Sequence, residues 1–148
     1  MEERLKMDKN DEIVFTVFGQ PSSQARARYF RRGNFSGMYD PSKKDKNTFA
    51  IIVQKYAPKQ PITEAISLEV IFYMLRPKSH YGTGKNSSQL KKTAPQNHSS
   101  KPDIDNLTKF VIDAMNTIFF KDDSLISQLN VKKIYSDIPR TEVKIKKL

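Results

Sequence analysis

Carboxylates concentrate in one short stretch of the sequence. Asp103 and Asp105 are separated by one residue, Lys109 lies four residues after Asp105, and Asp122 and Asp123 are adjacent. Clustered carboxylates bind divalent cations, and Mg²⁺ usually takes one or two of them together with water and phosphate oxygens. A cation held there could activate a water and stabilise the leaving oxygen, while Lys109 could neutralise charge on a phosphate. These residue types therefore indicate metal-dependent phosphodiester hydrolysis.

Ordinary structural roles could explain parts of this set. One aspartate could cap the helix that follows, and Asp105 with Lys109 could form a surface ion pair contributing roughly a few tenths of a kcal/mol. In an extended segment leading into that helix, Asp103 and Asp105 would project from the same face, with Asp105 or the next residue as the cap. Capping explains one carboxylate, but neither two on one face nor the second pair, Asp122 and Asp123.

The rest of the sequence is strongly basic. The 148 residues carry 26 Lys and Arg against 16 Asp and Glu, a formal net charge of +10. Residues 26–46 have a net charge of +5 and residues 76–101 of +6, whereas residues 102–123 have −3. Carboxylates would repel a phosphate ligand unless a divalent cation lay between them. The pattern therefore predicts a nucleic acid held by the basic blocks and cut at the acidic stretch.

Composition excludes several other classes. The absence of cysteine excludes a disulfide framework, a thiolate zinc site and a cysteine nucleophile. No apolar run approaches the roughly 20 residues of a membrane helix, and the N-terminus is too charged for a signal peptide. We expect a soluble intracellular protein without a membrane partner or small-molecule cofactor. A charged segment 1–12, for which disorder is one expectation, would precede a single domain over 13–148.

Apolar periodicity predicts the elements that must position the acidic residues. Alternating residues predict four strands and a hairpin around Gly33-Asn34. The strands are expected at 13–18, 66–75, 126–136 and 141–147, and the hairpin at 29–39. Because the second half of 66–75 is apolar at every position, we expect it to be covered on both faces.

Helical spacing predicts two helices. One follows Pro41-Ser42, and the other runs from about 106 to 117 with a single apolar stripe. Residues 76–101 show no periodicity, and a basic loop of this length is either functional or disordered. The order β-β-β-α-β-α-β-β predicts a mixed α/β (α+β) domain, with a mixed β-sheet and two main helices.

Helix length constrains how the acidic residues can meet. A helix over 106–117 is about 18 Å long. The segment from Ile118 to Asp123 spans at most about 20 Å when extended, so Asp123 could barely return to Asp103 within one chain. Completion of the site by a second subunit is the alternative, and we expect at least a dimer.

Two stretches resemble the RusA family of Holliday junction resolvases, which is common in bacteria and their prophages. KPDIDNLTKFVIDAMNTIFFKDDSLI, residues 101–126, is similar to the family pattern of Asp-x-Asp-Asn-Leu, a lysine four residues after the second Asp, and a later Asp-Asp pair. FGQPSSQARARYFRRGNFSGMYDP, residues 18–41, resembles the family's Gly-x-Pro loop, Arg-x-Arg and Tyr-x-Pro elements.

The resemblance implies a RusA-like dimer, dependent on Mg²⁺ or Mn²⁺, that nicks four-way junction DNA symmetrically. By position it implies that Asp103, Asp105 and Asp123 are essential metal-site carboxylates, with Asp122 adjacent to them. It also implies that Lys109 is the catalytic lysine. Asp113 has a counterpart in the family helix, and we assign it a structural role.

We therefore predict a structure-selective, metal-dependent DNA endonuclease that resolves Holliday junctions in recombination and repair, in the cytoplasm of a bacterium and encoded by the host, a phage or a prophage. The basic residues expected to contact DNA are Arg26, Arg28, Arg31, Arg32, Lys85, Lys91, Lys92 and Lys101. Two alternatives remain open, a non-catalytic nucleic-acid-binding protein and a flap or RNA nuclease that uses the same metal site.

Overall fold

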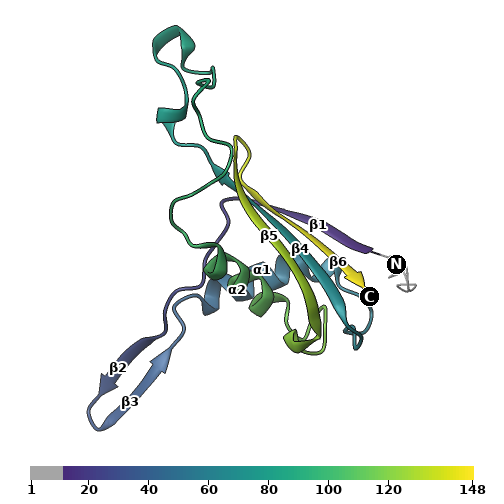
Figure 1. Ribbon diagram of the computed structural model, residues 1–148. Helices are drawn as coiled ribbons and strands as arrows, with labels where there is room; N and C mark the ends of the chain where they lie inside the picture. The colour runs from purple at the N-terminus through teal and green to yellow at the C-terminus, as the bar shows by residue number, and fades with distance from the viewer. Residues whose placement is uncertain (1–11) are drawn as a thin grey trace.

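A computed structural model of the chain describes residues 12–148 (Figure 1). The expectation for residues 1–12 therefore falls, except for Glu12, outside the described residues. Glu12 is the first residue of a strand, one position before the predicted start. No helix among the described residues is long and apolar enough to cross a membrane.

Four strands form one mixed sheet in the order β1-β6-β4-β5. β4 and β5 are parallel, whereas β6 is antiparallel to both of its neighbours. A separate antiparallel pair, β2 and β3, forms the predicted hairpin. The strands are β1 (Glu12–Phe18), β2 (Arg28–Arg32), β3 (Phe35–Tyr39), β4 (Ile66–Leu75), β5 (Ile126–Ser136) and β6 (Arg140–Lys147).

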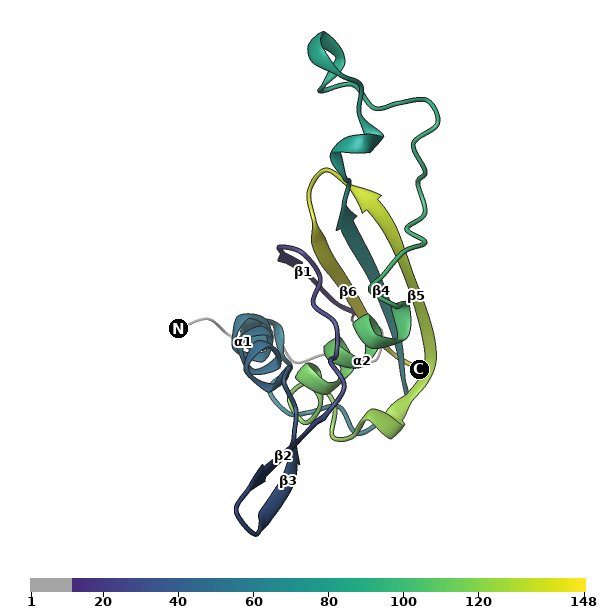
Figure 2. The same cartoon turned by 90° about the vertical axis from the view of Figure 1, so that its left-hand side faces the viewer.

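Both main helices, α1 (Lys43–Val53) and α2 (Ile104–Met115), cover the same face of the sheet (Figures 1 and 2). The predicted order of elements is confirmed, and the fold is a mixed α+β domain. The core lies between this face and the helices. Alternate residues of β4 from Ile66 to Met74 are buried there against the apolar stripe of α2, which includes Leu107, Phe110 and Met115.

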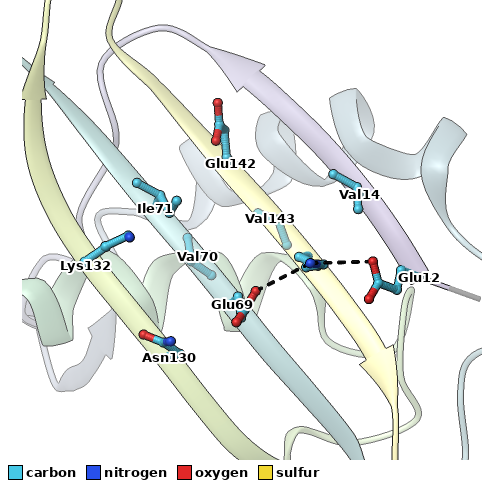
Figure 3. Close-up of a pocket in the computed structure, with 10 residues that line it drawn as sticks. Glu12, Val14, Glu69, Val70, Ile71, Asn130, Lys132, Glu142 and Val143 are labelled. Carbon is cyan, nitrogen blue, oxygen red and sulfur yellow. Dashed lines mark ion pairs between the residues drawn. The ribbon is translucent and has the colours of Figure 1, made fainter.

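No helix of residues 12–148 covers the opposite face of the sheet (Figure 3). Lys144 pairs there with Glu12 at 3.6 Å and Glu69 at 4.0 Å. The expectation that the second half of β4 is covered on both faces is wrong within one chain. Leu75 is 54% exposed because only neighbouring side chains cover this face, as where Arg140 lies over the Tyr73 ring.

Two excursions leave the domain in opposite directions (Figures 1 and 2). The β2–β3 hairpin projects beyond the helices. The predicted long loop, residues 76–101, extends beyond the other end of the sheet and contains two short 3-10 helices, η2 (Lys78–His80) and η3 (Gly84–Asn86). Its return limb pairs with β5 through a bridge between Asn97 and Ile134, which leads the chain into α2.

Candidate active site

Asp103 and Asp105 flank the first residue of α2. Asp103 is extended, with φ −70° and ψ 143°, and is the N-cap residue, although its side chain makes no capping hydrogen bond. The predicted start near residue 106 and a cap at Asp105 or Asn106 are therefore wrong. Pro102 favours an extended path before the helix, and an aspartate suits the non-helical cap position, so the helix begins at once after Asp103. Asp105 lies in the first helical turn instead of an extended segment.

Both carboxylates are accessible to a ligand. Asp103 and Asp105 are exposed, and neither forms an ion pair within residues 12–148. Among the described residues, the hydrogen bond that the carboxylate of Asp105 accepts comes from the Asn106 N–H at 3.0 Å. Lys109 follows one turn later, exposed, and in the described part of the chain it has no ion-pair partner. The carboxylates of Asp103 and Asp105 therefore retain lone pairs that could bind a cation. Their negative charge is also favourable beside the N-terminus of α2.

Lys133 of β5 holds the segment that leads into this site. Its Nζ donates to the carbonyl oxygens of Ser100 at 2.5 Å and Pro102 at 2.7 Å. Sequence reasoning missed this residue. The signal was present, however, because alternation in the strand predicts that either Lys132 or Lys133 faces the helices, and a half-buried ammonium needs acceptors.

A buried histidine supports the same segment. His98 packs against the Tyr135 ring with centroids 4.8 Å apart, and its Nε2 lies 3.3 Å from the hydroxyl of Ser100. Burial, together with the nearby charge of Lys133, lowers the pKa of His98, which favours the neutral ring. The Arg76 guanidinium lies 5.4 Å from the centroid of the same Tyr135 ring. Both ends of the long loop are thus attached to β5 near the acidic pair.

The basic hairpin is attached beside the same helix terminus. The Gln24 N–H donates to the carbonyl oxygen of Asn106 at 2.9 Å, and the Ala25 N–H donates to the Ser42 hydroxyl at 2.8 Å. Arg26 and Arg28 follow directly and are exposed. The structure therefore brings the beginning of the first basic block next to the helix turn that carries Asp105.

An ion-pair network fixes the base of the hairpin. Lys46 bridges Asp40 at 2.5 Å and Asp113 at 3.4 Å, and Gln24 donates to Asp40 at 2.8 Å. The hydrogen bond from Lys46 is the main cause that lowers the pKa of Asp40 to about 2. Because Asp113 joins α2 to α1 in this network, its contacts suit the structural role assigned to it. The roles of Asp40 and Lys46 were not visible in the sequence.

Asp122 and Asp123 lie at the other end of α2. They are exposed and begin the short helix η4 (Asp123–Leu125), which leads into β5. The Asp122 side chain accepts a hydrogen bond from the Ser124 N–H at 3.2 Å, which lowers its pKa. α2 is 12 residues, or about 18 Å, long. Within residues 12–148 no three acidic or histidine side chains lie close enough to hold a metal, so the described residues do not gather Asp103, Asp105 and Asp122 or Asp123 into one such group.

The predicted DNA-contacting residues are all exposed and fall into two groups. Arg26, Arg28, Arg31 and Arg32 lie on or just before the hairpin. The lysines lie along the long loop, with Lys85 on its outer part, Lys91 and Lys92 on its return limb, and Lys101 two residues before Asp103. Only Lys101 and the start of the hairpin are adjacent to the acidic pair.

Comparison with known proteins identifies the family. The family model described as endodeoxyribonuclease RusA matches residues 19–146. The chain belongs to the RusA family. It is also similar to the uncharacterised protein YqaN of Bacillus subtilis (strain 168), with 37% identity over 140 residues that cover 93% of this chain and 98% of the relative.

Membership of the RusA family confirms the resemblance noted in the sequence. The matched region contains the hairpin, both helices and the sheet strands β4, β5 and nearly all of β6, whereas β1 precedes it. The family is one of Holliday junction resolving endonucleases, so the chain is a nuclease by family. The acidic pair on α2 and the arginines beside it are the features of this fold that suit cleavage of a phosphodiester.

Proposed function

We propose that this protein is a structure-selective, divalent-metal-dependent DNA endonuclease that resolves four-way junctions by paired symmetric nicks. The observation that carries the proposal is the arrangement of side chains at the N-terminus of α2. Two accessible carboxylates, Asp103 and Asp105, lie there beside the base of an arginine-rich hairpin, linked through the Gln24–Asn106 hydrogen bond. Acidic and basic groups so close together suit a phosphate bound through a cation.

The donor set at α2 fits Mg²⁺, with Mn²⁺ as the alternative. Asp103 and Asp105 would hold the ion, since Mg²⁺ commonly takes two carboxylates and completes its shell with water and phosphate oxygens. When bound, such an ion supplies an activated water and stabilises charge on the leaving oxygen. Lys109, one turn further along the helix, would bring its ammonium to the phosphate oxygens and neutralise the charge that develops on them.

The second acidic pair would come from a partner subunit. Asp103 precedes α2, whereas Asp122 and Asp123 follow its other end in the same chain, and the resemblance to the family assigns Asp123 to the metal site. In a two-fold symmetric dimer the same contact occurs twice. Each α2 terminus would then meet the η4 segment of the other subunit, which gives two sites for two opposed strands.

The basic groups would hold the arms of the junction. Arg26 and Arg28 at the start of the hairpin, together with Lys101, would contact backbone phosphates next to the cut. The other basic residues, Arg31, Arg32, Lys85, Lys91 and Lys92, would contact DNA further away. Phosphate contacts position a nucleic acid without reading its sequence. The enzyme would act in the bacterial cytoplasm, where its DNA is found, and a phage or prophage origin remains a prediction from the resemblance.

Cleavage assays test the function directly. The protein is incubated with labelled four-way junction, duplex, flap and RNA substrates, with Mg²⁺ or with EDTA, beside Asp105→Asn and the matched control Asp45→Asn. Asp45 is also an exposed aspartate in the first turn of a helix. We expect paired nicks in the junction alone, lost with EDTA and with Asp105→Asn, and unchanged with Asp45→Asn.

Other results would reject parts of this proposal. Junction binding without cleavage that depends on metal and on Asp105 would identify a non-catalytic binding protein. Equal cutting of every substrate would leave a nuclease but not a resolvase. Preferred cutting of the flap or of RNA would assign the same metal site to another substrate.

A further inference from the structure

The two faces of the β2–β3 hairpin carry different side chains. Strand register sets directly opposed residues on the same face. One face holds the pairs Arg28 with Tyr39, Phe30 with Gly37, and Arg32 with Phe35. The other face holds the pairs Tyr29 with Met38 and Arg31 with Ser36.

On the first face the aromatic rings contact one another, although Phe35 remains 66% exposed and Tyr39 46% exposed. The Phe30 ring lies 6.0 Å from that of Phe35 and 6.2 Å from that of Tyr39, measured between centroids. Gly37 opposite leaves room for this ring, since a Cβ at position 37 would lie 3.1 Å from Phe30. These aromatic residues therefore support the hairpin itself, which as a two-stranded unit has little stability of its own.

The second face is bare. Tyr29 is 66% exposed and Met38 is 68% exposed, although the two lie directly opposite each other. No other aromatic ring packs on Tyr29 within the described residues. Tyr29 and Met38 form the second residue pair from the base of the projecting hairpin, and side by side they present an exposed apolar surface. Within residues 12–148 this surface stays exposed.

Charge identifies what can cover it. Four arginines lie between residues 26 and 32, and no Asp or Glu occurs from residue 13 to residue 39. A second copy would bring the same arginines to the same surface, so self-association through the hairpin is opposed by like charges. The ligand must combine negative charge with flat apolar faces. Nucleobases on their phosphate backbone have this combination, since aromatic and methionine side chains stack on bases while arginines contact the phosphates.

We propose that Tyr29 and Met38 stack on an unstacked base at the branch point of the DNA, with Arg31 contacting a flanking phosphate. This inference rests on the proposed junction-cleaving function and gives the hairpin a role in substrate selection. Bases inside a duplex are stacked on both faces, whereas a branch point interrupts the stack and exposes a base face. The Gln24–Asn106 hydrogen bond attaches the hairpin to the N-terminal turn of α2. A nucleobase stacked on the hairpin would therefore hold its DNA strand near Asp103 and Asp105.

A fluorescent base at the branch point tests the stacking. The parent is Asp105→Asn, to prevent cleavage, and the probe is a four-way junction with 2-aminopurine at the branch nucleotides. Tyr29→Leu keeps an apolar side chain but removes the ring, Tyr29→Phe restores the ring, and Met38→Thr removes the other half of the surface. Phe18→Leu is the matched control, because Phe18 is 73% exposed on β1, outside the hairpin.

We expect the parent to change the 2-aminopurine fluorescence on binding. Tyr29→Leu and Met38→Thr should abolish this change and weaken junction binding about tenfold, with binding to duplex unaltered. Tyr29→Phe and Phe18→Leu should behave as the parent. Circular dichroism checks that each variant is still folded. The substitutions leave the contacts of Phe30 with Phe35 and Tyr39 on the other face in place.

Three outcomes would overturn the inference. If the parent binds the junction but Tyr29→Leu and Met38→Thr leave fluorescence and affinity unchanged, the surface does not touch bases, and the nuclease proposal stands. If Tyr29→Leu instead changes the sedimentation of the free protein, the surface contacts a second copy. If the parent binds no DNA and the wild-type chain cuts none, both the stacking inference and the proposed function fail.

Discussion

The ammonium of Lys133 donates to the carbonyl oxygen of Pro102 at 2.7 Å, which ties the middle of β5 to the residue before Asp103. The same Nζ also reaches the carbonyl of Ser100. Hydrogen bonds from a charged donor are stronger than those between neutral groups. One lysine therefore fixes the path of the chain just before the α2 carboxylates, without being one of the groups that would touch the metal or the phosphate.

Replacement of this lysine should loosen the acidic pair. We expect Lys133→Met to reduce junction cleavage about 10- to 100-fold, as is typical when a group that orients metal ligands is lost. The Mg²⁺ concentration for half-maximal rate should rise, while junction affinity in EDTA should stay unchanged. Single-turnover cleavage measured across a Mg²⁺ series checks both expectations.

The neighbouring residue provides the control. Lys132 lies on the open face of the sheet (Figure 3), so Lys132→Met removes the same charge without touching the Ser100–Pro102 segment. Lys133→Arg keeps a charged donor and should recover part of the activity. Equal losses for both methionine variants would show that only the overall positive charge matters, and an unchanged Mg²⁺ requirement in Lys133→Met would contradict the positioning role.

Local pattern was sufficient to predict the elements. Alternation in residues 66–75 and 126–136 predicts β4 and β5 with their observed bounds, because one face of each strand meets the core. The apolar stripe containing Leu107, Phe110 and Val111 likewise predicts α2, with an error of two residues at each end. The family motif on α2 was readable for the same reason, since its spacing lies within one helix and its flanks.

Contacts between distant segments were not predictable. Lys46 and Asp113 are separated by 67 residues, and Gln24 meets Asn106 only after α1, α2 and the hairpin have packed together. Exposure of Leu75 was also missed, because periodicity does not show on which face helices will pack. Composition predicted a nucleic-acid partner, but only the fold shows which arginines lie beside the carboxylates.

Mixing two inactive variants tests completion of the site by the partner subunit. Asp105→Asn and Asp123→Asn homodimers should both be inactive. In a mixed dimer, one site would receive both substitutions and the other neither, so nicking should return to about a quarter of the wild-type level at equal mixing. The product should be a single nick, since only one site is intact. Gel analysis of labelled strands after unfolding and refolding the mixture measures this.

The same mixture distinguishes the alternative. If Asp103, Asp105 and Asp123 met within one chain, every site in a mixed dimer would carry one substitution and nicking would not return. A mixture of Asp103→Asn with Asp105→Asn is the control. Both residues lie on the same α2 terminus, so each site of a mixed dimer would carry one substitution under either arrangement.

Acid should weaken the base of the hairpin in a defined pH window. The Asp40 carboxyl has a pKa of about 2 in the folded chain, against 3.8 ordinarily, chiefly because Lys46 donates to it. Its stabilising effect is therefore complete above about pH 4 to 5, declines as the pH falls towards 2, and is then lost. At pH 7 Asp40→Asn should reduce the free energy of unfolding by about 1 kcal/mol, a small value because the pair is partly exposed.

Thermal unfolding followed by circular dichroism checks this window. The melting temperatures of the wild type and Asp40→Asn should differ at pH 7 and converge between pH 4 and pH 2. Asp45 is an exposed aspartate on α1, the helix that carries Lys46, and it has no ion pair in the described residues, so Asp45→Asn should follow the wild type throughout. A constant difference between wild type and Asp40→Asn down to pH 2 would show that the network with Lys46 does not depress this pKa.

Salt dependence should reveal which arginines neutralise phosphates. The affinity for DNA falls as the salt concentration rises, and each phosphate contact that is lost makes the plot of log affinity against log salt less steep by about 1. We therefore expect Arg31→Gln with Arg32→Gln to reduce the slope for junction DNA by about 2, measured by fluorescence anisotropy from low to moderate salt. Lys59→Gln, which removes an exposed charge from the segment between α1 and β4, should leave the slope unchanged. Counterions are released only where a positive charge contacts the DNA backbone. A wild-type affinity that does not change with salt, or equal slopes for the arginine and lysine variants, would therefore show that the hairpin does not hold DNA.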